Sequence, residues 1–105
     1  MTVEELKEKL NDLSWEEQME FEMSERGAQD STDAMQEIER KMRELARQVT
    51  PPLLDQLEQD GGYVVWSLRL SPHVPGDSPA RRGRRFLHHA DRSVRYWAAE
   101  IIRGA

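Results

Sequence analysis

The sequence contains no cysteine, which excludes disulfide bonds, thiolate metal sites and cysteine nucleophiles. None of its apolar runs approaches the roughly 18 residues of a membrane-spanning helix. The N-terminus is acidic and lacks the basic flank and apolar stretch of a secretory signal. No serine or histidine stands in a nucleophile–base pattern, and no glycine-rich phosphate loop is present. We therefore expect a cytoplasmic binding protein and not an enzyme, with no metal and no cofactor.

Charge is distributed unevenly along the 105 residues, a length that fits one small domain. Residues 1–60 contain 17 acidic and 7 basic side chains, a net charge of −10. Residues 61–105 contain 3 acidic and 8 basic side chains, a net charge of +5. Such asymmetry is typical of proteins with charged partners, although the two regions can also neutralise each other inside the fold.

Residues 1–49 are predicted to form a pair of long acidic helices. Thr2 and Glu5 make a capping box at the start of the first helix. One face of this helix then carries the apolar residues Leu6, Leu10, Leu13 and Phe21, and the opposite face carries Trp15, Met19 and Met23. Ser14 and Glu17 offer a second capping box, so the helix either bends at Ser14 or continues to Gly27. We favour the continuous helix.

The second long helix is predicted to begin near Asp30 or Ser31. Its apolar residues recur at spacings of three and four, in the order Met35, Ile38, Met42, Leu45 and Val49. The seam covers only about two and a half heptads, so packing against the first helix is favoured over a free coiled coil.

Residues 50–105 are predicted to contain shorter helices. Thr50 and Pro51 start one helix, whose apolar face consists of Leu53, Leu54 and Leu57. Residues 63–70 suit either a strand or a fully buried helix, and the surrounding pattern favours the helix. Another helix opens near Pro79 with Asp77 or Ser78 as its cap, and the last runs from about residue 92 to 103.

An internal repeat aligns residues 60–66 with residues 91–97, pairing Asp60 with Asp91 and Trp66 with Trp97. The second copy carries a leucine-bearing segment, an Asp turn, Val-Arg and paired small residues, here Asp91, Val94, Arg95, Ala98 and Ala99. It resembles a HEAT-type helical repeat, and the whole chain is similar to small bacterial HEAT-like proteins of uncharacterised function. The resemblance implies an all-α fold with two long antiparallel helices followed by about two short HEAT-like hairpins. Such scaffolds mostly bind other macromolecules.

The first candidate site is an acidic face with apolar side chains beside it, formed by Trp15, Glu16, Glu17, Met19, Glu20 and Met23. Aromatic and methionine residues among acids suit a protein interface. The favoured partner is a protein with a basic surface, and the concrete hypothesis is an immunity or antagonist protein that occludes a basic toxin or effector. The alternative for Trp15 is packing onto the C-terminal region, which the pattern favours.

The second candidate site is the basic stretch of Arg81, Arg82, Arg84 and Arg85, to which Arg92 could be added. It could bind phosphates, so a nucleic-acid-associated HEAT-like protein is the alternative function. The acidic charge of the whole chain disfavours nucleic acid, and pairing of these arginines with the acidic N-terminal helices is favoured. A homodimer through the Met35–Val49 seam or the Trp15 stripe stays open.

Overall fold

A computed structural model of the chain describes residues 1–25 and 31–104, and all regular elements within these ranges are helical, as predicted. The α-helices are α1 (Val3–Glu25), α2 (Ser31–Ala46), α3 (Pro51–Leu57), α4 (Val64–Leu70), α5 (Pro79–Arg84) and α6 (Arg92–Arg103). Two short 3-10 helices, η1 (Gly61–Tyr63) and η2 (Ser71–His73), flank α4. No helix in the described ranges is long and apolar enough to cross a membrane.

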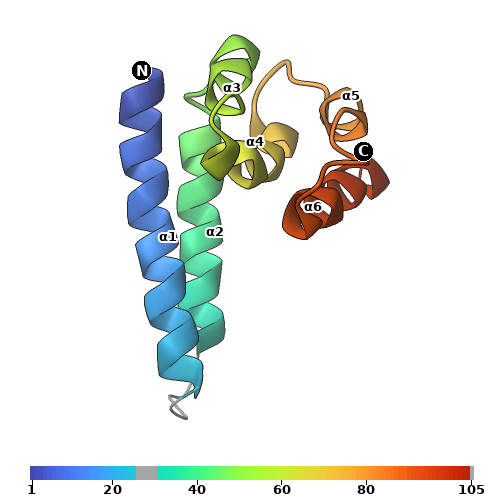
Figure 1. Cartoon of the computed structure of the whole chain (residues 1–105). Coiled ribbons are helices and arrows are strands. Elements are labelled where there is room, and N and C mark those ends of the chain that lie inside the picture. Colours follow the sequence, from blue (N-terminus) through green and yellow to red (C-terminus); the bar gives the residue numbers. More distant parts are fainter. Residues whose placement is uncertain (26–30, 105) are drawn as a thin grey trace.

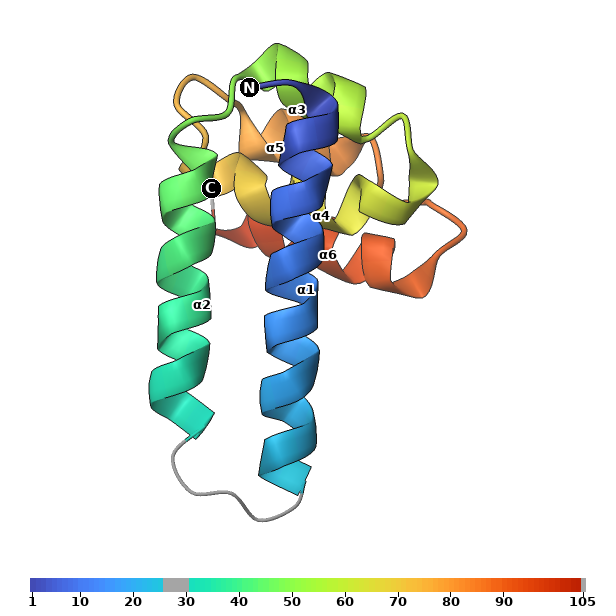
Figure 2. The same cartoon turned by 90° about the vertical axis from the view of Figure 1, so that its left-hand side faces the viewer.

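The two long helices lie side by side and antiparallel, and the shorter helices gather against only part of their length (Figures 1 and 2). At 1.5 Å per residue, the 23 residues of α1 span about 35 Å. Helices α3 and α4 pack against the end of this hairpin that holds the N-terminus, and α5 and α6 lie on the far side of α4 (Figure 1). The opposite end of the hairpin projects beyond the short helices (Figure 1). The molecule therefore has a packed region and a projecting one.

The helix starts follow the predicted capping chemistry. The Thr2 hydroxyl accepts a hydrogen bond from the Glu5 backbone N–H at 3.1 Å and donates one to the Glu5 carboxylate at 3.3 Å. The Thr50 hydroxyl accepts from the N–H of Leu53 at 3.4 Å, at the start of α3. Local side-chain chemistry thus sets the beginning of both helices.

The two aspartates of the internal repeat make the same local contact. Asp60 accepts a hydrogen bond from the Gly62 N–H at 3.0 Å, and Asp91 accepts one from the Ser93 N–H at 2.7 Å. Asp91 also accepts from the N–H of Val94 at 3.3 Å. Each aspartate therefore caps the element that follows it, although in the first copy this element begins as a 3-10 turn.

Helix α1 is continuous through Ser14, which decides between the two predicted forms of the helix. The favoured continuous helix is confirmed, and the Ser14 hydroxyl, which the bent alternative would use as a cap, instead accepts a hydrogen bond from Nε1 of Trp66 at 3.0 Å. Ser14 thereby joins α1 to α4. The predicted helix end at Gly27 and the predicted start at Asp30 lie outside the described residues.

Two apolar clusters form the interior, and α4 contributes to both. Trp66 and Leu70 belong to the cluster that α1, α2 and α3 share, whereas Val64 and Leu68 pack with residues of α6. Because α4 is buried on both faces, its apolar residues do not recur with a helical period. Its β-branched residues are also typical of a strand, so the sequence is compatible with either element. The predicted helix over residues 63–70 is confirmed in α4.

Candidate functional site on the projecting hairpin

Exposed apolar side chains gather on the projecting part of the hairpin. We define the distal half as residues 15–25 of α1 and 31–37 of α2; the side chains described within it are those of residues 15–22 and 34–37. Of the six large hydrophobic residues exposed among the described residues, four lie in the distal half: Trp15, Met19, Phe21 and Met35. A soluble surface rarely holds that many large apolar side chains in so small an area without an interaction role.

Trp15 and Met19 lie one helical turn apart on the outer face of α1, with 63% and 42% of their surface exposed. The expected packing of Trp15 onto the C-terminal region is wrong. Helix α4 contacts α1 through Ser14 and Glu17, which lie on the side of α1 away from Trp15. The backbone of Met23 lies in α1, and its side chain lies outside the described residues.

Phe21 and Met35 form a second exposed pair, on the inner face of the hairpin. Their exposed fractions are 64% and 39%. Together with Glu17, Gln18 and Glu20 they line a hollow of about 460 Å³. The sequence pattern placed both residues on buried faces, and this was wrong because the short helices end before they reach this level of the hairpin (Figure 1).

Two of the predicted binding glutamates form ion pairs with other helices of the protein. Glu16 pairs with Lys41 of α2 at 3.1 Å. Glu17 accepts two hydrogen bonds from Arg69 of α4, at 2.9 and 3.0 Å, in a bidentate pair that is mostly shielded from solvent. Glu20 makes no ion pair with any described residue and borders the hollows on both faces of the hairpin. Only part of the predicted acidic site is therefore available to a partner.

The distal half is acidic throughout. Residues 15–25 and 31–37 contain seven acidic side chains and no basic one. Lysine and arginine from elsewhere neutralise some of them, through the contacts of Glu16 and Glu17 and through an ion pair between Glu37 and Arg40. Among the described residues, no group of three histidine, aspartate or glutamate side chains is arranged to hold a metal ion.

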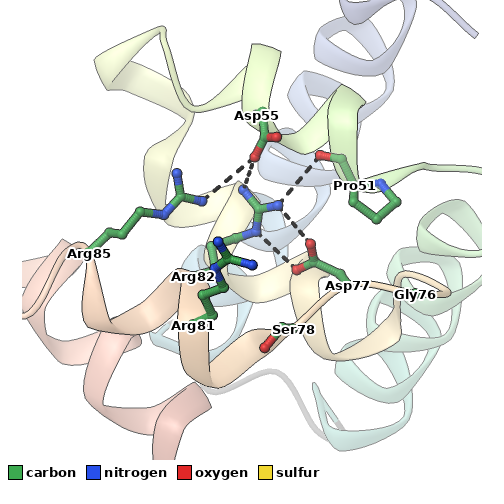
Figure 3. A pocket seen from close by; sticks show the side chains of 8 residues that line it. All are labelled: Pro51, Asp55, Gly76, Asp77, Ser78, Arg81, Arg82 and Arg85. Atoms are coloured by element: carbon green, nitrogen blue, oxygen red, sulfur yellow. Dashed lines mark hydrogen bonds and ion pairs between the residues drawn. The ribbon is translucent and has the colours of Figure 1, made fainter.

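The predicted basic site is centred on a buried arginine. Arg82 is 4% exposed, and all five of its N–H donors have partners. The Arg82 guanidinium donates to Asp77 at 2.7 and 3.0 Å and to Asp55 at 2.9 Å (Figure 3). It also donates to Glu58 at 2.7 Å. Burial opposes the charge, yet these carboxylates keep the pKa of Arg82 above its ordinary value. Arg82 is a structural residue.

Arg81 and Arg85 line a hollow of about 360 Å³ together with Arg82, and Arg84 does not border it (Figure 3). Arg85 pairs with Glu58 at 2.9 Å and with Asp55 at 3.6 Å. Arg81 and Arg84 are exposed and make no ion pair with the described residues. The arginines were expected to pair with the acidic long helices, and this is wrong for Arg82 and Arg85. Their partners are Asp55 on α3, Glu58 directly after it and Asp77 in the loop before α5, all much closer in sequence.

Comparison with protein families, curated proteins and solved structures finds no match to this chain.

Proposed function

We propose that the chain is a small protein-binding module whose distal half is the binding surface, and that it acts by stoichiometric occlusion of a partner with a basic surface. The single observation that carries the proposal is the exposure of Trp15, Met19, Phe21 and Met35 among acidic side chains. Large apolar anchors supply binding energy at protein interfaces, and complementary charge speeds encounter and selects the partner.

The concrete form of this proposal is a cytoplasmic immunity or antagonist protein that covers a basic toxin or effector. In this account the packed region is a scaffold that holds the hairpin rigid, and α3 to α6 are two HEAT-like hairpins. The equivalent caps at Asp60 and Asp91 support that organisation. So does the placement of the Arg69 guanidinium over both Trp66 and Trp97, at 4.3 and 5.2 Å from their ring centres.

Nucleic-acid binding through Arg81, Arg82, Arg84 and Arg85 remains the alternative function, and it has less support. Three carboxylates surround Arg82, and two of them also contact Arg85, so most of this positive charge is neutralised inside the protein. Self-association through the distal half is also disfavoured, since two copies would bring like charges together.

Affinity capture with matched charge variants tests the proposal. In Glu20→Lys/Glu22→Lys the charge changes within the distal half, whereas Glu4→Lys/Glu8→Lys makes the same change at exposed positions near the other end of α1. The bait is used at low salt in a lysate of the cells that naturally express the chain, and bound proteins are quantified by mass spectrometry. We expect the first variant to lose its partner and the second to retain it. Equal yields from both variants would contradict the proposal.

A further inference from the structure

The inner face of the hairpin holds two hollows, on either side of one ion pair. The first is the hollow of about 460 Å³ beside Phe21 and Met35. The second, of about 280 Å³, lies in the corner between the hairpin and the short helices, where Met42, Trp97 and Ile101 provide apolar surface. Glu17 borders the first hollow and Arg69 borders the second, and these two side chains form the bidentate pair. The two hollows thus lie on the same side of the hairpin with this ion pair between them, and we call them together the groove.

The spacing of the two hollows along α2 corresponds to two turns of a helix. Met35 marks the first hollow and Met42 the second, and these residues lie seven positions apart on α2. Seven residues are two turns, or about 10.5 Å. A helix lying along α2 would therefore place apolar residues at positions i and i+7 into the two hollows. Methionine side chains adapt their shape readily, which suits Met35 to a docking surface, whereas Met42 is 7% exposed and reaches the second hollow only with the edge of a core side chain.

The charge around the groove is negative. Glu20 borders the first hollow, and Glu39 and Glu100 border the second. Glu39 pairs with Arg43 at 3.5 Å and Glu100 with Arg103 at 3.2 Å, which reduces the negative charge at the second hollow, whereas Glu20 makes no ion pair with any described residue.

The basic groups that border the groove do not offset these glutamates. The charge of Arg69 is matched by Glu17. Partial burial and the nearby charge of Arg43 lower the pKa of His73, which leaves its imidazole neutral at pH 7. A ligand that fills the groove therefore meets apolar floors and acidic edges.

We infer that this groove binds a basic amphipathic helix of the partner, with apolar residues of the helix in the two hollows and lysine or arginine beside Glu20, Glu39 and Glu100. This inference rests on the proposed function and deepens it, because it names the face of the hairpin and the kind of segment that binds there. The outer pair of Trp15 and Met19 lies on the opposite side of α1 and takes no part in this contact.

A pair of synthetic peptides probes the groove in the full-length chain. Both have about 15 residues, a length at which helices become marginally stable in water, with leucine at positions i, i+3 and i+7. One carries lysine on its polar face and the other glutamate. In fluorescence anisotropy titrations we expect only the lysine peptide to bind. Phe21→Ala/Met35→Ala should weaken binding at least about tenfold. The control Gln59→Ala, at an exposed neutral position after α3 that borders neither hollow, should leave it unchanged.

The indole N–H resonances of the three tryptophans locate the peptide directly by NMR. Trp97 borders the groove, Trp15 lies on the outer face, and Trp66 is held by Ser14. We expect the lysine peptide to shift the Trp97 signal and leave that of Trp15 in place. A shift at Trp15 alone would overturn the groove and leave the proposed function standing. Equal binding of both peptides, or binding of neither, would overturn the basic helix as the ligand, while the capture experiment still tests the proposed function separately.

Discussion

Leu10 and Phe21 lie on the same face of α1, about three turns apart, and their surroundings differ completely. Leu10 is fully buried in the cluster shared with α2, α3 and α4, whereas Phe21 is mostly exposed. The two positions have similar helical phase and comparable apolar character. What separates them is how far the short helices reach along the hairpin. The apolar face of α1 is therefore buried in its proximal part and accessible to solvent in the distal half.

The largest expected effect concerns the charge network of the packed region. Arg82→Ala would leave the buried carboxylate of Asp77 without a charged partner and that of Glu58 with Arg85 alone, which should lower the free energy of unfolding by about 3–5 kcal/mol. The neighbouring Arg84 is exposed, so Arg84→Ala is the matched control and should stay within about 0.5 kcal/mol of the parent. Urea denaturation measures both. Equal stability of the two variants would show that the network does not hold the packed region together.

Alanine substitutions in the buried and the exposed part of α1 test the comparison between Leu10 and Phe21 directly. Leu10→Ala should cost about 2–5 kcal/mol, because it removes buried methyl groups and leaves a cavity. Phe21→Ala removes a larger side chain but should change the free energy of unfolding by no more than about 0.5 kcal/mol, since the ring is largely solvated. Thermal or urea unfolding of both variants gives the answer. A large loss for Phe21→Ala would mean that the distal half is part of the core.

The close contact between α5 and α6 gives a further test of tight packing in the packed region. A Cβ atom at Gly83 would lie 2.8 Å from the carbonyl oxygen of Ala98 and 2.8 Å from Cγ1 of Ile102. Gly83→Ala should therefore destabilise the protein by about 1–3 kcal/mol through overpacking. Gly61, which has open space around the position of its missing Cβ, is the control. If Gly61→Ala proved as harmful as Gly83→Ala, close packing would not be the reason.

The smallest expected effect is a dependence of stability on acid pH. Burial raises the pKa of Asp77, but hydrogen bonds from Arg82 and Ser71 outweigh it and hold this pKa below its ordinary value. A carboxylate with a lowered folded-state pKa stabilises the protein above its ordinary pKa and loses that contribution as the pH falls through the folded-state value. Asp77→Asn should thus flatten the acid limb of a stability–pH curve. The same curve for Asp12→Asn, which changes an exposed carboxylate, should keep the parent slope.

The helices and their caps could be predicted from the sequence because their causes are local. Thr2, Thr50 and Asp91 each contact a backbone N–H two or three residues later, so their neighbours in sequence suffice to identify them. The same is true of the apolar face of α3, where the predicted residues Leu53, Leu54 and Leu57 are all buried.

The environment of individual side chains could not be predicted, because it depends on contacts between distant segments. Trp15 and Phe21 look like core residues in the sequence, and only the reach of the short helices leaves them exposed. Arg82 looks like a surface cation until Asp55, Glu58 and Asp77 are placed around it. The lengths of the predicted helices were a signal that Phe21 could be exposed. A hairpin about 35 Å long cannot be covered along its whole length by helices of 6 to 12 residues.

The central claim is that the exposed apolar residues of the distal half bind a partner without being needed for the fold. The most direct measurement combines partner yield in affinity capture with the free energy of unfolding for Trp15→Ala/Phe21→Ala. Tyr96→Ala, an exposed aromatic on α6, is the control. We predict that the double variant loses most of its partner while its stability stays within about 0.5 kcal/mol of the parent, and that the control loses neither. Full partner yield from a stably folded double variant would contradict the account.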